Sequence, residues 1–179
     1  MTTMRIDKID VERRQIEAAI RLLFENENQI AAHTLAAAGS QIVRDLCEVR
    51  KIVGFEEFKD LIKPEHMKDY WRVYNRSANF FKHADKDGAA TYEFNPEETD
   101  YVLLFAIKWY RDLGATPTSV MVAYLSWFAA SNPNTLKEGA TFGPWQPAFD
   151  KMKSFLNHVD RAERLELGKE VFAKVRAHQ

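Results

Sequence analysis

Apolar side chains recur along most of this chain every three or four residues, which is the spacing of one face of an α-helix. In residues 7–26 charged side chains occupy the positions between the apolar ones, which predicts an amphipathic helix. The polar face of this helix is assigned to Glu12, Arg13, Arg14, Glu17 and Arg21. Residues 29–52 form a longer, Ala-rich stretch, and small side chains let a neighbouring helix approach closely. We therefore expect a second helix that is buried on more than one side.

The rest of the chain continues this helical pattern, interrupted by Pro, Gly and short polar segments. We expect a short helix or turn at 54–63, a long central helix near 64–84, a loop or short hairpin-like excursion at 85–96, and helices at 97–113 and 117–131. An ordered loop at 134–147 and two last helices at 148–159 and 160–177 complete the chain. Pro64 suits the first turn of the central helix, and Gly114 suits the end of the next one. Because strand patterns are almost absent, the predicted fold class is all-α, a bundle of about six or seven helices in a single domain, residues 1–179.

Composition and charge exclude few functions. Of the 179 residues, 46% are hydrophobic, which is enough for a sizeable core, and 25 basic against 26 acidic residues leave a formal charge of −1. Binding to a polyanion such as RNA would therefore depend on a local group of Lys and Arg side chains. The single cysteine, Cys47, excludes an internal disulfide and is interpreted as a small buried residue.

The sequence lacks the segments and motifs of several other protein classes. No apolar run approaches the roughly 18 residues that a bilayer span needs. The N-terminal sequence MTTMRIDKIDVERR carries charges where a signal peptide needs its apolar segment. There is no phosphate-binding Gly-rich loop, no nucleophile elbow and no Cys-rich metal cluster. We expect a cytoplasmic protein that has no cofactor and no contact with membranes.

The stretch from Tyr70 to Gly88, YWRVYNRSANFFKHADKDG, holds the densest aromatic run of the chain. On a helical wheel, the stripe predicted to face the core contains Met67, Trp71, Tyr74, Ala78 and Phe81. The opposite side contains Asp69, Arg72, Arg76, Asn79 and His83. Arg76 and His83 are seven positions apart, two helical turns, so their side chains leave the helix on nearly the same line, with Asn79 beside it.

These three polar side chains are suited to the cleavage of RNA. A histidine exchanges a proton near neutral pH, an arginine holds a phosphate or stabilises charge that develops on it, and an asparagine orients either group. Together they could let a ribose 2′-hydroxyl attack the adjacent phosphate, a reaction that needs no metal in principle. The alternative is that Arg76 and His83 are merely exposed polar residues of an amphipathic helix, His83 at its end.

The segment RSANFFKH, an Arg followed by six residues and then a His late in a helix, resembles the signature of the HEPN superfamily (higher eukaryotes and prokaryotes nucleotide-binding). That signature is an Arg, four to six residues and a His in an all-α bundle. The resemblance implies a metal-independent endoribonuclease or RNA-binding protein, often a toxin or defence protein, whose homodimer places two motifs around a shared cleft. It makes Arg76 and His83 the candidate catalytic pair, gives Ser77 the place of the polar residue after the Arg, and leaves Asn79 as a plausible helper.

A metal site is a weaker interpretation of the same region. His83, Asp85 and Asp87 alternate in HADKD, but His83 belongs to a helix end. The calcium-loop pattern fails because Gly88 comes too early and Pro96 stands where the terminal Glu should be. We predict no metal ligands here.

Two further interpretations stay open. His33 lies in the Ala-rich stretch and is interpreted as a packing residue, although it would face Arg76 or His83 if the two helices pack side by side. A second functional hypothesis is a non-catalytic interaction or regulatory module, in which the same polar face binds a protein partner or a nucleotide.

Overall fold

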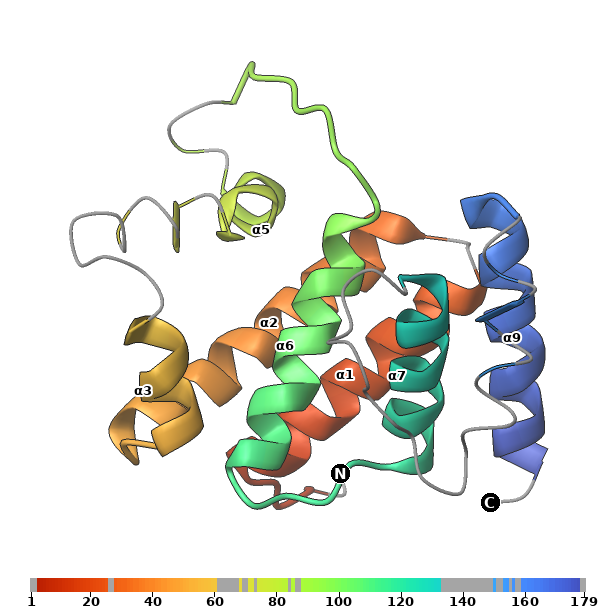
Figure 1. Ribbon diagram of the computed structural model, residues 1–179. Coiled ribbons are helices and arrows are strands. Elements are labelled where there is room, and N and C mark those ends of the chain that lie inside the picture. The colour runs from red at the N-terminus through yellow and green to blue at the C-terminus, as the bar shows by residue number, and fades with distance from the viewer. Residues whose placement is uncertain are drawn as a thin grey trace.

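Helices form all the regular secondary structure in the part of the chain that the structure describes (Figure 1). The computed structural model describes residues 3–25, 28–60, 68, 71–72, 74–83, 85, 88–132, 150, 153–154, 156 and 159–177. Within these ranges lie α1 (Lys8–Glu25), α2 (Gln29–Val49), α3 (Val53–Asp60), α5 (Arg76–Lys82), α6 (Glu98–Asp112), α7 (Ser119–Ser131) and α9 (Arg161–Ala177). The predicted all-α class is confirmed. None of the described helices is both long enough and apolar enough to cross a lipid bilayer.

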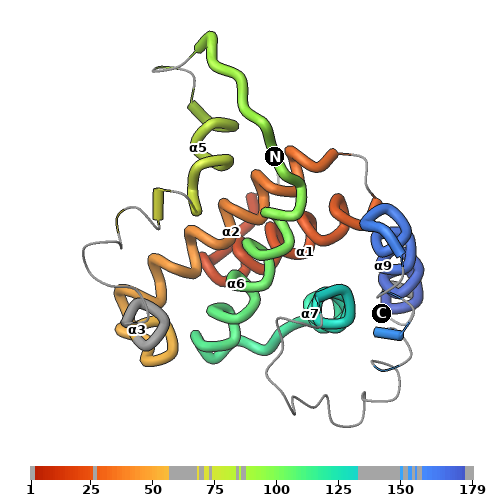
Figure 2. The backbone as a smooth tube through the Cα atoms, turned by 45° about the horizontal axis from the view of Figure 1, so that its top comes forward, coloured from red at the N-terminus to blue at the C-terminus, as the bar shows by residue number. Residues whose placement is uncertain are grey.

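Helix α2 lies in the middle of the molecule, with α1 and α6 packed along it (Figure 1). Helices α7 and α9 pack against each other and against α1. Figure 2 shows α3 and α5 on the side of α2 that faces away from α9. The bundle is therefore built around α2, and α5 is attached at its edge.

The core contains large apolar side chains from α1, α6 and α7, packed against small ones from α2. The fully buried large residues include Ile16, Ile20, Leu23, Phe24, Leu103, Ile107, Trp109, Met121, Tyr124 and Trp127. On α2 the buried residues include Ala32, Ala36, Gly39, Ser40 and Val43. A Cβ atom at Gly39 would lie 3.2 Å from Cγ1 of Ile16, so α1 and α2 approach closely. The prediction that the Ala-rich helix is buried on more than one side is confirmed.

Local polar residues set several of the helix ends. The side-chain oxygen of Asn28 accepts the backbone N–H of Ala31 at 2.9 Å and begins α2. The hydroxyl of Thr118 accepts the N–H of Met121 at 3.4 Å and begins α7. Gly114, with a φ of 85°, follows the end of α6, as its position in the sequence predicts. These ends are properties of short segments and can therefore be identified in the sequence.

The region predicted as one long helix near residues 64–84 is less regular than expected. Helix α5 covers Arg76–Lys82, and the described helical residues that precede it in this region are Lys68, Trp71, Arg72 and Tyr74. Asn75 lies in a turn between them, although its N–H still donates to the carbonyl of Trp71 at 3.0 Å. Asparagine weakens helix interiors because its side chain bonds elsewhere, which explains the turn. Pro64, Met67 and Asp69 lie outside the described residues.

Glu12 does not belong to the polar face of α1, and that prediction is wrong. Its side chain is completely buried, and neither carboxylate oxygen has a hydrogen-bond partner among the described residues. The reason is visible in the spacing, because Glu12 precedes the buried Ile16 by one helical turn and so lies on the core face. Burial raises the pKa of the Glu12 carboxyl from 4.5 to about 8.

The buried Glu12 should make the stability of the protein depend on pH. The folded chain holds a proton on Glu12 up to about pH 8, whereas the unfolded chain loses it near pH 4.5, so stability is lost as the pH rises between these values. Between pH 5 and pH 8 this one group lowers the free energy of unfolding by roughly 3 kcal/mol. In urea titrations, Glu12→Gln should not show this decrease in the free energy of unfolding between pH 5 and pH 8. The exposed control Glu166→Gln should still show it. An unchanged pH dependence in Glu12→Gln would contradict the burial of a protonated Glu12.

Gly168 of α9 lies against the ring of Phe24, which is buried in the core. A Cβ atom at Gly168 would overlap with that ring. Gly168→Ala gains about 0.5–1 kcal/mol of helix propensity but costs about 1–3 kcal/mol through overpacking. We therefore expect a net loss of about 1–2 kcal/mol in the free energy of unfolding. Phe24→Leu makes room for the added methyl group, so adding Gly168→Ala to that variant should cost nothing further; an equal loss in both backgrounds would argue against the contact.

Candidate functional site

Arg44 of α2 holds the residues that lead into α5. Its side chain is buried, and one guanidinium nitrogen donates to the side-chain oxygen of Asn75 at 3.0 Å. The guanidinium carbon lies 4.5 Å from the ring centroid of Trp71 and 5.1 Å from that of Tyr74. The Tyr74 hydroxyl is hydrogen-bonded to Oγ of Ser40 at 3.1 Å. Trp71 and Tyr74 thus pack against the core, as the predicted stripe requires.

The second half of α5 is covered by residues 88–96 of the predicted loop, which contain no helix or strand. Ala78 is buried, and the ring of Phe81 lies 5.1 Å from that of Phe94 and 6.3 Å from that of Tyr92. Phe80 packs against Tyr92 at 5.3 Å. Residues of the loop therefore cover both Phe80 and Phe81.

The three predicted site residues, Arg76, Asn79 and His83, are exposed. The guanidinium carbon of Arg76 lies 5.1 Å from the ring centroid of Tyr92, and among the described residues Arg76 forms no ion pair. His83 follows the last residue of α5 in an extended conformation, φ −128° and ψ 127°, while its N–H still donates to the carbonyl of Asn79 at 3.1 Å. A single copy of the chain thus presents these side chains to solvent.

Ser77, the residue after Arg76, is buried, in contrast to the three exposed side chains. Its hydroxyl donates to the carboxylate of Glu98 in the first turn of α6 and lies 2.9 Å from the hydroxyl of Tyr92. Because the one hydroxyl proton of Ser77 is used for Glu98, Tyr92 is the donor to Ser77. These contacts join residues 15 and 21 positions apart and had no signal in the sequence.

His33 of α2 is a packing residue, as the sequence predicts. It is buried, its Nδ1 lies 3.1 Å from Oγ1 of Thr99, and its ring packs edge-on against Phe81 at 5.7 Å and Phe94 at 5.2 Å. Helices α2 and α5 do pack side by side, but the ring of His33 meets Phe81 instead of Arg76 or His83. Burial lowers the pKa of His33 from 6.5 to about 4, so the imidazole is neutral at physiological pH.

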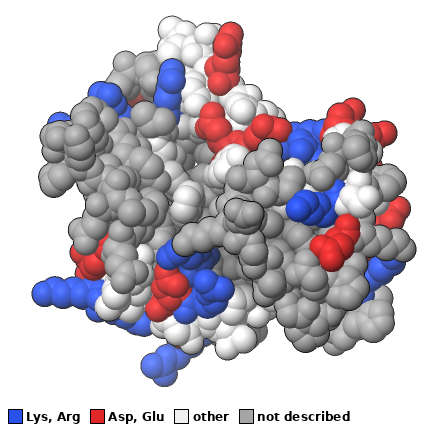
Figure 3. Space-filling model, viewed as in Figure 1, with Lys and Arg blue, Asp and Glu red and all other residues white. Residues whose placement is uncertain are grey.

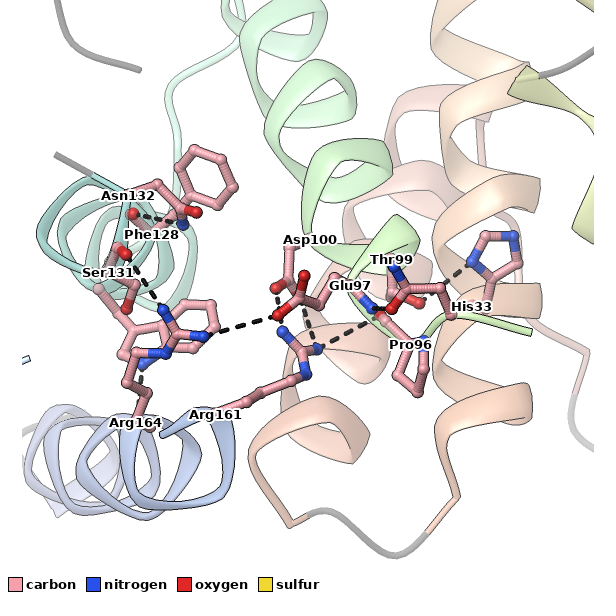
Figure 4. A network of polar contacts seen from close by, with 12 residues as sticks. His33, Pro96, Glu97, Thr99, Asp100, Phe128, Ser131, Asn132, Arg161 and Arg164 are labelled. Carbon is pink, nitrogen blue, oxygen red and sulfur yellow. Dashed lines mark hydrogen bonds and ion pairs between the residues drawn. The ribbon is translucent and has the colours of Figure 1, made fainter. Parts of the chain in front are cut away.

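The first turn of α6 carries a second group of polar contacts (Figure 4). Two guanidinium nitrogens of Arg161 donate to the two carboxylate oxygens of Asp100, and one of these contacts measures 3.0 Å. Burial raises the pKa of the Asp100 carboxyl, and the hydrogen bond and charge of Arg161 act against that rise. Arg164 donates to the carbonyl of Ser131 at 3.3 Å and lies 3.6 Å from a carboxylate oxygen of Glu97.

These groups line a small pocket between α6, α7 and α9. Its lining comprises Glu97, Asp100, Tyr101, Trp127, Ser131, Asn132, Arg161 and Arg164. Both arginines are already bonded to carboxylate and carbonyl groups, so the pocket is interpreted as a structural joint. Sequence reasoning missed it because Asp100 and Arg161 are 61 positions apart.

The charges on the described surface are mixed. On the face shown in Figure 3, Lys and Arg side chains alternate with Asp and Glu, without a broad area of one sign among the residues drawn in colour. Among the described residues close to Arg76 in the sequence, the exposed basic side chains are Lys68, Arg72 and Lys82. Any attraction for RNA at α5 would therefore be local, as the overall charge of −1 implies.

Neither Cys47 nor the HADKD segment, which was considered as a metal site, adds a reactive group to the described part of the chain. Cys47 is buried, and burial raises the pKa of its thiol to about 12, so the interpretation as a packing residue is confirmed. Asp85 is exposed, and Asp87 lies outside the described residues. Across the described ranges, no group of three His, Cys, Asp or Glu side chains is placed to hold a metal ion.

The buried His33 should lower the stability of the protein in acid. The unfolded chain binds a proton on His33 below pH 6.5, whereas the folded chain does so only near pH 4, so stability is lost as the pH falls below 6.5. From pH 7 to pH 5 this contribution amounts to about 2 kcal/mol and opposes the gain from Glu12. The free energy of unfolding of His33→Gln, compared with that of the wild type in urea titrations, should therefore be higher at pH 5 than at pH 7. The same change with pH in both proteins would contradict a neutral, buried His33.

Comparisons with known proteins give no further information about this site. No family model matches the chain, and neither the curated proteins nor the solved structures contain a significant match. The function of the exposed side of α5 is therefore argued from the contacts of its own residues.

Proposed function

We propose that this chain is a HEPN-like helical protein that cleaves RNA without a metal ion, with Arg76, Asn79 and His83 as its site and a homodimer as its active form. The observation that carries the proposal is the environment of Arg76. Its guanidinium is exposed, lies over the ring of Tyr92 and is not neutralised by any carboxylate of the described residues. Such a guanidinium is available to a phosphate group.

The chemistry is an attack of the ribose 2′-hydroxyl on the adjacent phosphorus. The bond from the 2′-oxygen to phosphorus forms, and the bond from phosphorus to the 5′-oxygen breaks. The 2′-hydroxyl gives up a proton, and the leaving 5′-oxygen takes one, so the reaction needs a base and an acid. His83 fills one of these roles, Arg76 stabilises the charge on the phosphorane, and Asn79 orients either side chain.

A second copy of the chain would supply what one copy lacks. Within the described residues, each copy presents the exposed guanidinium of Arg76 in α5 and the exposed imidazole of His83 directly after it. Two copies facing each other would bring two imidazoles and two guanidiniums around one phosphate. The second copy would also exclude water from side chains that are exposed in a single chain, which strengthens their electrostatic effect.

His83→Ala should lower the rate of RNA cleavage roughly a hundred- to ten-thousandfold, because it removes the acid or base. Arg76→Ala should lower the rate by about a hundredfold or more, because charge on the phosphorane is no longer stabilised. The assay follows end-labelled RNA in excess EDTA and identifies products that end in a 2′,3′-cyclic phosphate. A substrate with 2′-deoxyribose at the cleaved position should stay intact.

Arg111→Ala, at an exposed arginine of α6, is the matched control and should cleave like the wild type. Thermal melts followed by circular dichroism verify that the variants fold. Wild-type protein that leaves RNA intact both with and without EDTA would contradict the enzyme proposal. Cleavage that survives in His83→Ala would instead locate the activity elsewhere.

A second candidate is a non-catalytic interaction module, and one observation favours it. The extended backbone of His83 departs from the helical position on which its alignment with Arg76 was predicted. In that case the exposed side of α5 is a binding surface. The expected results are an inactive wild-type protein, a stoichiometric protein partner in pull-downs, and loss of that partner in Arg76→Ala.

A further inference from the structure

We propose that Tyr92 is the positioning residue for Arg76, and that it holds the guanidinium where an RNA phosphate meets the exposed side of α5. This inference rests on the proposed function for the identity of the ligand. Tyr92 lies outside the Arg and His motif, in the segment predicted only as a loop. Its role follows from contacts that the folded chain makes with its ring and its hydroxyl.

The first contact is with Arg76 itself. The guanidinium carbon lies 5.1 Å from the centroid of the Tyr92 ring, within the range of a cation–π interaction. An exposed arginine otherwise samples many rotamers and must lose that freedom when it binds. A ring that holds the guanidinium beforehand reduces this entropic cost, which favours phosphate binding.

The other contacts fix the Tyr92 ring. Its hydroxyl donates to the buried Ser77, which in turn donates to Glu98 of α6. The ring packs against Phe80 at 5.3 Å and against Phe81 at 6.3 Å. Tyr92 therefore contacts α5 directly and α6 through Ser77. Its ring position, and with it the position of the Arg76 guanidinium, depends on how these two helices are placed.

The ring and the hydroxyl have separable roles. The ring contacts Arg76, whereas the hydroxyl fixes the ring through Ser77. Tyr92→Phe keeps the ring and its packing, so it should retain most of the effect on Arg76. Tyr92→Leu removes the aromatic face and should release the guanidinium. Tyr101→Leu, at a partly exposed tyrosine of α6, is the matched control.

Binding is measured with a 2′-O-methyl RNA oligonucleotide, which cannot be cleaved because its 2′-oxygen has no proton to lose. Tyr92→Leu should weaken binding about two- to fivefold, the range of one exposed cation–π contact. Tyr92→Phe and Tyr101→Leu should bind like the wild type. In an Arg76→Ala background, Tyr92→Leu should have no further effect, because Tyr92 acts through Arg76. Thermal melts identify any variant that has lost its fold.

Cleavage of unmodified RNA gives the second measurement. Tyr92→Leu should lower kcat about tenfold, with a smaller change in KM, because a displaced guanidinium supports the transition state poorly. Equal binding by Tyr92→Leu and wild type, or equal losses with and without Arg76, would overturn the positioning role. A wild type that binds but does not cleave refutes the catalytic proposal. The binding of Tyr92→Leu with and without Arg76→Ala then still decides the role of Tyr92. A wild type that does not bind RNA refutes both.

Discussion

Four consecutive residues, the N-cap residue Glu97 and the first three residues of α6, contact four other helices. Glu97 pairs with Arg164 of α9, Glu98 accepts from Ser77 of α5, and Thr99 meets His33 of α2. Asp100 pairs with Arg161 of α9, and its carbonyl accepts the hydroxyl of Tyr124 of α7 at 2.5 Å. Acidic side chains are favoured here because the free N–H groups of a helix start carry partial positive charge. One turn thereby fixes how α2, α5, α7 and α9 meet.

The position of α5 depends on polar and aromatic contacts, both with this turn and with α2. Helix α5 is short, and its buried residues are Ser77 and Ala78. Apolar burial on that scale fixes a helix weakly, so the polar contact from Ser77 to Glu98 and the rings around Phe81 carry much of its placement. Residues 88–97 lead directly into α6. Tyr92 and Phe94, which contact α5, are therefore connected to the start of α6. Contacts with α2 and with the start of α6 thus orient the exposed side of α5.

The sequence allowed the helices to be predicted because their patterns are local. Capping by Asn28 and Thr118 and the glycine after α6 depend on residues a few positions apart. The burial of Glu12 could have been derived from its spacing of four positions from Ile16 in the sequence. It was assigned to the surface only because its side chain is charged. The contacts of Asp100 with Arg161 and of Ser77 with Glu98 could not be predicted, since they arise only when distant helices pack. For the same reason the sequence identified the exposed residues of α5 and missed Tyr92, which supports them.

The environment of each arginine and histidine separates structural side chains from candidates for chemistry. Arg44 is bonded to Asn75 and stacked on Trp71, and Arg161 is paired with Asp100, so their charges are committed to the fold. The guanidinium of Arg76 rests on an aromatic ring, which orients it without neutralising it. His33 is buried and uncharged at neutral pH, because burial lowers its pKa to about 4. An acid or base must be reached by its substrate, and of the two described histidines only the exposed His83 meets that requirement. The same two residue types thus stabilise the bundle as Arg44, Arg161 and His33, and they are exposed as Arg76 in α5 and as His83 directly after it.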